Sequence, residues 1–402
     1  MKIGIIREGK VPSDNRAALT PRQCAFLMRN YAVQIVVEPS PIRCYSDAEY
    51  LLEGVAVTNN LSDCDMLLGI KEVPITQLIP NKTYFFFSHT VKKQVYNRKL
   101  LQTILEKNIK IIDYELLTNE YGLRLIAFGR YAGMVGAHNG MLAYGARTGA
   151  YSLTRMKDLH DYAQARNLYK TIQLPPVRVV VTGTGRVASG AVEVLRDLGL
   201  KQVSPHNYLK KNFNTAVFTQ LSPTEYVERK DSLPFKKADF YAHPDRYKSI
   251  FAPFYQKTEV FINGIFYDKK APMFFTSDEM TQKDFKIKTI SDISCDLMPH
   301  SSVPSTIRAT TIDAPFYGFD PFSKQETLPF QEKSIDMMTI DNLPNELPRD
   351  ASEFFGTQFM ANILPELLKA KDSIVLQKAT IAENGQLTDR FHYLQAFVDD
   401  ES

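Results

Sequence analysis

The sequence predicts an α/β protein with two halves, the first of which forms a doubly wound parallel sheet. Two observations support this fold class. In residues 1–125 short apolar strands alternate with helical patterns, which is typical of parallel sheets covered by helices. In residues 177–200 an apolar run meets a glycine-containing turn and then an amphipathic helix, as in the βα unit that binds dinucleotides. The residues before this unit are numerous enough to form a separate domain that carries the substrate.

The elements of the first half follow from its hydrophobic periodicity. Strands are expected at KIGIIRE, VQIVVEP, CDMLLGIKE, TYFFFSH and IKIIDYELL, and helices at PRQCAFLMRN and RKLLQTILEKN. Next, residues 127–153 are rich in small residues at near-helical spacing and predict a buried helix that packs very close to a neighbour, as a spine between the two halves. A membrane-type helix of small residues is disfavoured there, because Arg130, His138 and Arg147 interrupt it.

Gly183, Gly185 and Gly190 mark the turn of the predicted βα unit. Glycines at such a turn let backbone amides approach a pyrophosphate, with the N-terminus of the helix behind them. The spacing is looser than the usual G-x-G-x-x-G. A plain βα turn that needs glycine for steric reasons is therefore the alternative interpretation.

Beyond this turn the pattern becomes irregular. Residues 204–258 mix aromatic and charged side chains, and we interpret them as an insertion over the sheet rather than part of its core. Regular strands return at EVFINGIF and KTISDIS. A proline-punctuated loop and a long helix are expected in residues 341–368, and an Asn-Gly turn follows near the C-terminus.

Composition excludes several classes of function. The chain has 402 residues, and its 48 Lys and Arg nearly balance 45 Asp and Glu, so the net charge of +3 points to neither nucleic acid nor membrane. No apolar run approaches the roughly 18–20 residues of a membrane span, and MKIGIIREGK predicts a strand rather than a signal peptide. The four cysteines lack metal-ligand spacing, so we expect no metal and reduced thiols in a cytoplasmic protein.

Polar residues follow two of the apolar strands. Lys71 and Glu72 come after DMLLGI, and His89 comes after TYFFFS. Because ligands bind at the carboxyl edge of parallel sheets, Lys71 and His89 form a candidate acid–base pair; the ordinary alternatives are a surface lysine and a capping or core histidine. Arg16 and Arg124 are candidates for binding carboxylates through the guanidinium fork, with surface arginines as the alternative.

Several longer blocks carry a resemblance to a known family. In chain order they are REGKVPSDNRAALTP, GIKEVP, FFSHTVKKQ, IIDYELL, LRLIAFGRYAGMVGA, VVVTGTGRVASGA, ISDIS and IDNLPNELPRDASEFF. Together they resemble the lysine-forming saccharopine dehydrogenases of the alanine dehydrogenase and transhydrogenase superfamily. The stretch LPRDASEFF is particular to the saccharopine branch.

The resemblance implies two Rossmann-like doubly wound parallel-sheet domains with an active-site cleft between them. It implies a substrate and catalytic domain at residues 1–130, completed by 350–402, and a dinucleotide-binding domain at 131–349 with the insertion near 204–258. The implied activity is the oxidation of saccharopine, with NAD and water, to lysine and 2-oxoglutarate.

The resemblance also implies roles for individual residues. Lys71 would take the proton from the secondary amine of the substrate as hydride leaves the adjacent carbon, and His89 would manage protons while water adds to the imine. Such oxidation needs a neutral nitrogen lone pair, and hence a base poised near neutral pH. The substrate-binding set, with three cations that suit three carboxylates and two acids that tune the catalytic pair, comprises Arg16, Lys92, Arg124, Glu72, Glu115 and Phe128.

The implied cofactor site comprises the pyrophosphate turn (Gly183, Gly185, Arg186 and Val187), the adenine-ribose position (His206) and the nicotinamide end (Asp292, Asp341 and Leu343). The ribose position departs from the family, because an aspartate is expected at the end of the second Rossmann strand and this chain has His206. With Lys210 and Lys211 just beyond, NADP is the alternative to NAD. Leu123 also stands where an arginine is expected beside Arg124.

Other functions stay open beside saccharopine oxidation. The reverse reaction, a reductive condensation of lysine with 2-oxoglutarate, would use the same site. An alanine dehydrogenase-like enzyme would deaminate a primary amine, and the blocks HTVK and PRDASEFF disfavour it. A non-catalytic dinucleotide-binding protein would be expected to lose the lysine or the histidine, and an interaction protein rests on the aromatic residues 240–257 alone. We expect small-molecule partners only, and a monomer or small homo-oligomer.

Overall fold

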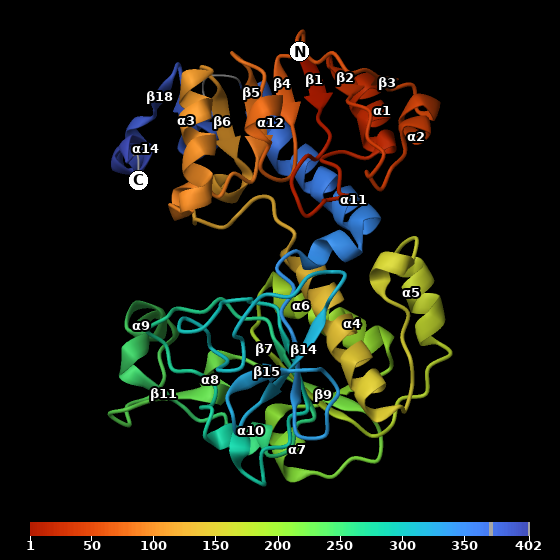
Figure 1. The fold of residues 1–402 in the computed structure, drawn as a ribbon, viewed down its shortest axis with the longest axis vertical. Helices are drawn as coiled ribbons and strands as arrows, with labels where there is room; N and C mark the ends of the chain where they lie inside the picture. Colours follow the sequence, from red (N-terminus) through yellow and green to blue (C-terminus); the bar gives the residue numbers. More distant parts are fainter. Residues whose placement is uncertain (370–372, 401–402) are drawn as a thin grey trace. The chain divides into compact units, whose positions relative to one another are not determined.

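The computed structural model describes residues 1–369 and 373–400, which divide into two compact units. Unit 1 comprises Met1–Phe128 together with Pro348–Ser402, and unit 2 comprises Gly129–Leu347. In Figure 1 red, orange and dark blue segments form the sheet of unit 1, whereas segments from yellow-green to light blue form the sheet of unit 2. The chain therefore completes unit 1 only after it has formed all of unit 2.

Unit 1 is an eight-stranded sheet with helices packed on it (Figure 1). Its strands, in the spatial order β18-β17-β6-β5-β4-β1-β2-β3, are β1 (Lys2–Ile5), β2 (Gln34–Val37), β3 (Ala56–Val57), β4 (Met66–Leu68), β5 (Thr83–Phe86), β6 (Lys110–Asp113), β17 (Thr380–Glu383) and β18 (Gln386–Leu387). Strands β1 to β6 pair in parallel, and β17 and β18 add antiparallel pairs at one edge. Because β1 lies between β2 and β4, the strand order reverses there, and the ligand crevice of such sheets lies at this switch point.

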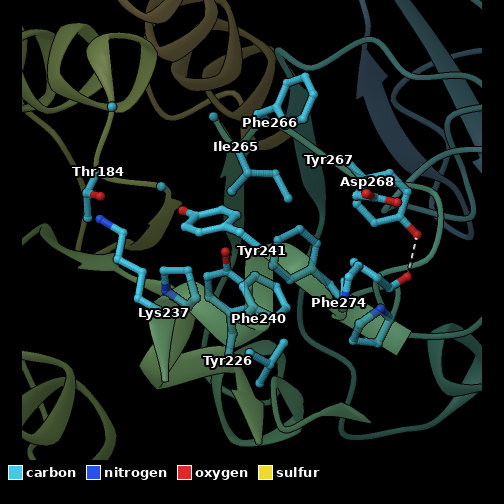
Figure 2. A pocket seen from close by; sticks show the side chains of 18 residues that line it. Thr184, Tyr226, Lys237, Phe240, Tyr241, Ile265, Phe266, Tyr267, Asp268 and Phe274 are labelled. Atoms are coloured by element: carbon cyan, nitrogen blue, oxygen red, sulfur yellow. Dashed lines mark hydrogen bonds between the residues drawn. The ribbon is translucent and has the colours of Figure 1, made fainter. Parts of the chain in front are cut away.

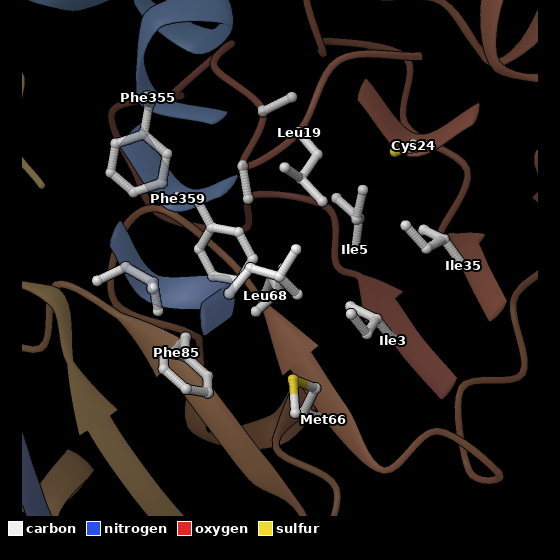
Figure 3. Packing of buried hydrophobic residues seen from close by; sticks show 14 of the residues in the cluster. Ile3, Ile5, Leu19, Cys24, Ile35, Met66, Leu68, Phe85, Phe355 and Phe359 are labelled. Atoms are coloured by element: carbon white, nitrogen blue, oxygen red, sulfur yellow. The ribbon is translucent and has the colours of Figure 1, made fainter. Parts of the chain in front are cut away.

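The strands of unit 1 are buried on both faces, which explains their nearly continuous apolar sequences. Ile3 and Ile5 face one hydrophobic cluster, whereas Leu67 of the neighbouring strand faces another. Figure 3 shows Phe355 and Phe359 packed over the first of these clusters. The helices of unit 1 are α1 (Pro21–Asn30), α2 (Asp47–Leu52), α3 (Arg98–Glu106), α11 (Pro348–Gln358), α12 (Leu364–Leu368), α13 (Ile374–Ala379) and α14 (Gln395–Asp399).

The Asn-Gly turn predicted near the C-terminus is confirmed. Asn384 and Gly385 have φ angles of 54° and 73° and connect β17 to β18 as a hairpin. Two consecutive left-handed residues match the right-handed twist of the paired strands, which is why Asn-Gly is favoured there. This hairpin extends the sheet of unit 1 beyond β6.

Unit 2 contains a second eight-stranded sheet, in the order β15-β14-β16-β13-β12-β7-β9-β8. Its strands are β7 (Arg178–Thr182), β8 (Lys201–Gln202), β9 (Val217–Leu221), β12 (Val260–Asn263), β13 (Thr289–Asp292), β14 (Phe316–Asp320), β15 (Gln325–Thr327) and β16 (Ile335–Met338). A separate antiparallel pair joins β10 (Val227–Arg229) to β11 (Tyr247–Ser249). The six neighbouring strands β16, β13, β12, β7, β9 and β8 pair in parallel. At the β16 edge, β14 and β15 add antiparallel pairs. The switch point lies at β7, between β9 and β12.

The interpretation of residues 204–258 as an insertion outside the core is wrong for the first part of that segment. Strand β9 lies inside the sheet between β7 and β8, and its Val217 and Phe218 are fully buried. This strand was not predicted because its five residues form only a short apolar run between two polar stretches, KKNFNT and SPTE. Only the later part, from Pro223 to Tyr255, consists of short elements outside the large sheet.

The close packing predicted for the glycine-rich helix is confirmed, and its partner lies in the same unit. A Cβ atom on Gly133 of α4 would collide with the carbonyl oxygen of Val187, and one on Gly190 of α6 would collide with that of Arg130. The helices of unit 2 are α4 (Gly129–Thr148), α5 (Tyr162–Tyr169), α6 (Arg186–Asp197), α7 (Pro205–Lys210), α8 (Pro223–Tyr226), α9 (Lys237–Ala242) and α10 (Ala252–Tyr255). Among residues 1–369 and 373–400, no helix has the length and apolar character needed to cross a membrane.

Candidate active site

The carboxyl edge of the unit 1 sheet brings Lys71, Glu72 and His89 together. Lys71 and Glu72 follow β4, and His89 follows the neighbouring β5. Nδ1 of His89 lies 2.6 Å from Oε1 of Glu72, while the Nζ atom of Lys10, in the loop after β1, lies 2.7 Å from Oε2. One carboxylate thus joins three neighbouring strand ends at the switch point.

Glu72 is a buried carboxylate held in its charged form. Burial by itself would raise the pKa of Glu72, but the hydrogen bonds with His89 and Lys10 outweigh this effect and lower the pKa to about 2. A carboxylate that accepts from Nδ1 fixes the tautomer and the orientation of the imidazole. The other ring nitrogen, Nε2, is then available for proton transfer.

Lys71 lies in an environment that disfavours its positive charge. Burial lowers the pKa of the Lys71 ammonium from its ordinary value, and the neighbouring charge of Arg16 lowers it further. The backbone at this point is held by Glu8, whose carboxylate accepts the amide hydrogens of Ile70 at 2.6 Å and Lys71 at 2.9 Å. Burial and the charge of Asp14 raise the pKa of Glu8 itself to about 8. These are the conditions that produce a lysine able to act as a base.

Arg16 is buried and bound to an acid of its own loop. Its Nε and Nη2 atoms donate to the two carboxylate oxygens of Asp14 at 2.9 and 2.5 Å, and both side chains are almost fully buried. The guanidinium also lies 4.2 Å from the ring centre of Phe128, which stacks on Phe355 at 4.6 Å. Phe128, predicted to bind substrate, therefore supports Arg16 from one side.

Glu115, at the end of β6, draws together the two cations Lys92 and Arg124. Arg124 donates from Nη2 to Oε1 of Glu115, and Nζ of Lys92 lies 3.8 Å from Oε2, which accepts no hydrogen bond within the described part of the chain. The side chains of Lys92 and Arg124 are about half exposed, at 49% and 46%. Leu123, where an arginine was expected, is 62% exposed beside them.

Asp113 links the His89 loop to Glu115. This carboxylate is fully buried and accepts hydrogen bonds from the backbone amide and hydroxyl of Ser88, at 2.9 and 2.6 Å, and from the amide of Glu115 at 2.7 Å. Burial raises its pKa. His89 itself has a positive φ of 54° and stacks on Phe87, with ring centres 6.4 Å apart. The histidine is thus placed by its neighbours on both sides.

Four charged residues of this site were not predicted from the sequence: Glu8, Lys10, Asp14 and Asp113. A signal for three of them was present, because Glu8, Lys10 and Asp14 lie in the loop directly after the first predicted strand. The rule that selected Lys71 and His89, that ligands bind beyond the carboxyl ends of parallel strands, applies equally to that loop. Asp113 is the last residue of β6, but it lies inside the longer strand predicted at IKIIDYELL and so was not recognised as a residue at a strand end.

The turn after β7 in unit 2 has the geometry expected of a phosphate-binding turn. Gly183 has a φ of +99°, and a Cβ atom there would lie 2.7 Å from the carbonyl oxygen of Gly264. Gly185 is the N-cap residue of α6, offers no side chain to cap the helix, and a Cβ atom on it would meet nothing within 4 Å. A helix N-terminus with no side-chain cap and open space in front of it presents backbone N–H groups and the positive end of the helix dipole to a pyrophosphate, so the residues present fit a dinucleotide.

The other predicted cofactor residues lie in different surroundings. Arg186 and Val187 form the first turn of α6, and the Val187 carbonyl contacts Gly133 of α4. Asp292 is fully buried, with its carboxylate accepting from Thr306, Ser294 and Asn263 at 2.6 to 2.8 Å. Asp341 is exposed after β16, and Leu343 is buried at the start of the next 3₁₀ helix, Leu343–Glu346.

His206 was placed on the wrong strand. It lies on α7 after β8, which is the edge strand of the sheet, whereas the strand beside β7 is β9. The position that faces an adenine ribose in such folds is therefore the end of β9, at Leu221 and Ser222. The nearest acid there is Glu225, whose Oε2 atom accepts from the amide of Ser222 at 2.7 Å. Leu221 and Ser222 are not acidic, so the end of β9 also carries no aspartate.

A cavity of about 410 Å³ opens at the carboxyl ends of β7, β9 and β12. It is lined by the glycine turn, by aromatic residues from the segment after β9 and by the residues that follow Gly264, which Figure 2 shows from close by. Its volume is within the range of about 300–1,000 Å³ typical of small-molecule sites. His206, Asp292, Asp341 and Leu343 are not among its lining residues.

The fold is that of a two-unit protein of the Rossmann type, with a cluster of charged side chains at the edge of one sheet and a glycine turn that fits a pyrophosphate at the edge of the other. The family description "Alanine dehydrogenase/PNT, N-terminal domain" matches residues 4–135. Among solved structures, an L-alanine dehydrogenase superposes with a TM-score of 0.67 at 15% identity over 99% of both chains, and a Sinorhizobium meliloti transhydrogenase with 0.55 at 12% identity over 96% of this chain and 98% of the other. These structural matches confirm the predicted fold class.

Curated relatives confirm the resemblance to the saccharopine branch. Saccharopine dehydrogenase [NAD(+), L-lysine-forming] of Yarrowia lipolytica is 26% identical, covering 89% of this chain and 90% of that protein. Alpha-aminoadipic semialdehyde synthase of Arabidopsis thaliana is 30% identical over 98% of this chain and 41% of its own length, and the mitochondrial enzyme of Bos taurus is 29% identical over 95% and 46%. The chain thus spans less than half the length of these two relatives.

Proposed function

We propose that the chain is an NAD(P)-dependent amino-acid dehydrogenase that interconverts saccharopine and water with L-lysine and 2-oxoglutarate. The observation that carries this proposal is the cluster of Lys71 with the Glu72–His89 pair, since it joins a lysine of lowered pKa to an oriented histidine. The saccharopine dehydrogenases and the semialdehyde synthases among the relatives support this substrate class. Unit 1 would supply the acid–base chemistry and unit 2 the cofactor site.

Lys71 acts first in the proposed oxidation. The protonated secondary amine of the substrate gives a proton to the neutral Nζ of Lys71, which frees the nitrogen lone pair. That lone pair forms the C=N bond as the C–H bond of the adjacent carbon breaks with its electron pair. The nicotinamide of the bound dinucleotide supplies the hydride acceptor.

His89 acts in the hydrolysis of the imine. Water adds to the imine carbon and gives a proton to Nε2 of His89, while Nδ1 stays hydrogen-bonded to Glu72. The histidine then returns this proton to the nitrogen. The new hydroxyl group gives its own proton to Nε2 of His89 as its electron pair forms the C=O bond and the C–N bond breaks, which releases lysine and 2-oxoglutarate. Glu72 stabilises the imidazolium that forms between these two steps, because its lowered pKa keeps it ionised.

The geometry divides the three predicted carboxylate-binding cations into two kinds. Lys92 and Arg124 are half exposed, and such surface pairs open at little energetic cost, so we propose that these two bind substrate carboxylates. Arg16 is buried and neutralised by Asp14, and its proposed role is to keep the pKa of Lys71 low.

One observation favours the reductive reaction with NADPH. No aspartate ends β9, so the usual acceptor for the two ribose hydroxyls of NAD is missing from the described strand end, and NADPH could be the cofactor of a reductase. The site would hold NAD through Gly183, Gly185 and the first turn of α6, and NADP is compatible with the same turn.

We further propose a monomer or small homo-oligomer in the cytoplasm, where the free cysteines Cys24, Cys44, Cys64 and Cys295 would stay reduced.

The test is a set of four steady-state assays with the purified chain. Formation of NADH and of NADPH is followed separately, with saccharopine and with L-alanine as the control substrate. Turnover of saccharopine is expected with one of the two cofactors, and lysine with 2-oxoglutarate should drive the reverse reaction with the same cofactor. Turnover of alanine alone would contradict the proposal and favour the deaminating enzyme.

A further inference from the structure

The cavity in unit 2 is walled on one side by residues that no dinucleotide turn requires. Besides Gly183, Thr184 and Gly185, its lining includes Tyr226, Lys237, Phe240 and Tyr241 from the segment between β9 and β11. This is the later part of the stretch interpreted from the sequence as an insertion over the sheet. The segment therefore forms a wall of the cavity, directly beside the phosphate-binding turn.

Among the aromatic rings that line this cavity, Tyr226 and Phe240 are fixed by the core, whereas Tyr241 and Phe266 are largely exposed. Tyr226 packs edge-on against Phe274, with ring centres 5.1 Å apart, and Phe240 packs against Tyr247 at 5.0 Å. The residues Tyr241 and Phe266 are instead 58% and 92% exposed. Figure 2 shows the Tyr241 ring projecting into the middle of the cavity.

Exposed aromatic rings that line a concave site are suited to a flat ligand. A purine base presents a π-face to such rings, and stacking of a base on an aromatic side chain contributes about 1–3 kcal/mol. The cavity lies at the switch point beside β7, where the adenosine half of a dinucleotide binds in this class of fold. The rings and the place in the fold thus point to the same ligand group, adenine.

Lys237 adds a positive charge next to the turn. It is the first residue of α9, its side chain is exposed, and it forms no ion pair within the described chain. In Figure 2 its ammonium group points toward Thr184, between the two glycines of the turn. Asp268, the acid among the lining residues, lies on the other side of the cavity, and its Oδ1 accepts from the amide of Lys270 at 2.8 Å. The charge of Lys237 is therefore available to an anion at the turn.

We propose that the segment from Pro223 to Pro244 clamps the adenosine end of the cofactor. Tyr241 stacks on the adenine ring, and Lys237 binds a phosphate attached to the adenosine. This inference rests on the proposed dinucleotide cofactor and goes beyond it by assigning the residues that set nucleotide affinity. The phosphate has two sources, the pyrophosphate shared by NAD and NADP or the phosphate on the adenosine ribose of NADP.

The test measures binding directly, without turnover. NADH and NADPH are titrated into the full chain and followed by nicotinamide fluorescence, with adenosine 2′,5′-bisphosphate and ADP as competing ligands. The variants are Lys237→Met and Tyr241→Ala, and the matched controls are Lys236→Met, at the exposed neighbouring lysine, and Tyr241→Phe, which keeps the ring. Because Lys237 and Tyr241 are exposed, thermal unfolding of these variants should match that of the unaltered chain.

We expect Lys237→Met to weaken binding about tenfold, as for a lost charge-assisted hydrogen bond, and Tyr241→Ala to weaken it by a similar factor. Equal losses for NADH, NADPH and ADP identify the pyrophosphate as the partner of Lys237. A loss confined to NADPH and adenosine 2′,5′-bisphosphate identifies the ribose phosphate. Both controls should bind like the unaltered chain.

Some outcomes overturn the clamp, and they differ from those that overturn the proposed function. If the unaltered chain binds nucleotide and Lys237→Met and Tyr241→Ala bind it equally well, the clamp is wrong while the cofactor assignment stands. If the chain binds nucleotide through these residues yet turns over no saccharopine, the proposed function is wrong and the clamp stands. If the unaltered chain binds neither NADH nor NADPH, both are wrong.

Discussion

Units 1 and 2 are each built on an eight-stranded, mostly parallel sheet but differ in the chemistry at the carboxyl ends of their strands. Each has eight strands and a switch point, at β1 in unit 1 and at β7 in unit 2. In unit 1 the loops beyond these ends carry Glu8, Lys71 and His89. In unit 2 the corresponding loops carry Gly183 and Gly264, with aromatic residues nearby.

The difference shows what the fold decides and what the residues decide. Topology brings loops from neighbouring strands to one place, and this is common to both sheets. Charged side chains brought together there shift one another's pKa values, as Glu72 and Lys71 show. Glycines brought together at the same place instead leave the backbone accessible to a phosphate. The same kind of sheet edge thus carries the proposed acid–base cluster in one unit and the proposed cofactor turn in the other.

Replacement of Lys71 by methionine should give the largest effect and test the division of roles. The change removes the proposed base but leaves unit 2 intact, so we expect kcat to fall by about 10²–10⁴-fold with the Kd of the dinucleotide unchanged. Steady-state kinetics and fluorescence titration measure the two quantities. Lys110→Met, at the other end of a strand in the same sheet, is the control and should keep its activity. A Lys71→Met enzyme with unaltered kcat would refute the assigned base.

Replacement of Glu72 by glutamine should reveal the contribution of the charged Glu72 to the free energy of unfolding, because that contribution depends on pH. The folded-state pKa of about 2 lies below the ordinary value of 4.5, so ionised Glu72 stabilises the fold above about pH 4.5, and this contribution is lost as the pH falls toward 2. A shift of this size corresponds to roughly 3 kcal/mol. Glu72→Gln should therefore unfold more easily than the unaltered chain at pH 7, and the gap should narrow at pH 3.

Urea unfolding followed by circular dichroism at the two pH values measures this gap. Glu106→Gln, at the exposed end of α3, is the control and should leave stability unchanged at both. A gap of equal size at pH 7 and pH 3 would mean that the glutamine disturbs packing, and the charge argument would fail.

The same comparison shows how far the sequence could predict the site. Lys71 and His89 were predictable because each follows a long apolar strand, and position after a strand is a local property. Their partners were harder to predict. Lys10 lies 62 positions from Glu72 in the sequence, and only the packed sheet brings the two side chains together. Arg16 was identified as a carboxylate-binding residue, but its intramolecular partner, Asp14, was not recognised although it lies two positions away.

The fold was predicted well where periodicity alone determines the element. The strands and helices predicted for the first half fall where the apolar pattern placed them, because each buries its own hydrophobic residues. The short helix α2 and the two-residue strand β3 were not predicted. Strand β9 was missed, and with it the neighbour of β7 and the placement of His206. The order of strands in a sheet depends on contacts across the whole domain, so no local pattern could have shown that β8 lies at the edge.

The smallest expected effects come from a matched pair of glycine substitutions in the turn after β7. Gly183→Ala should lower the stability of unit 2 by at least about 1–2 kcal/mol, because its φ of +99° disfavours a side chain and a Cβ atom would press on the carbonyl oxygen of Gly264. Gly185→Ala should leave stability unchanged, since a Cβ atom there meets nothing within 4 Å, and should weaken dinucleotide binding about tenfold by filling the space of the phosphate. Thermal unfolding and NADH titration separate the two results. Unaltered nucleotide affinity in Gly185→Ala would mean that this turn serves the backbone of unit 2 alone, and the contrast between a catalytic and a binding sheet edge would no longer hold.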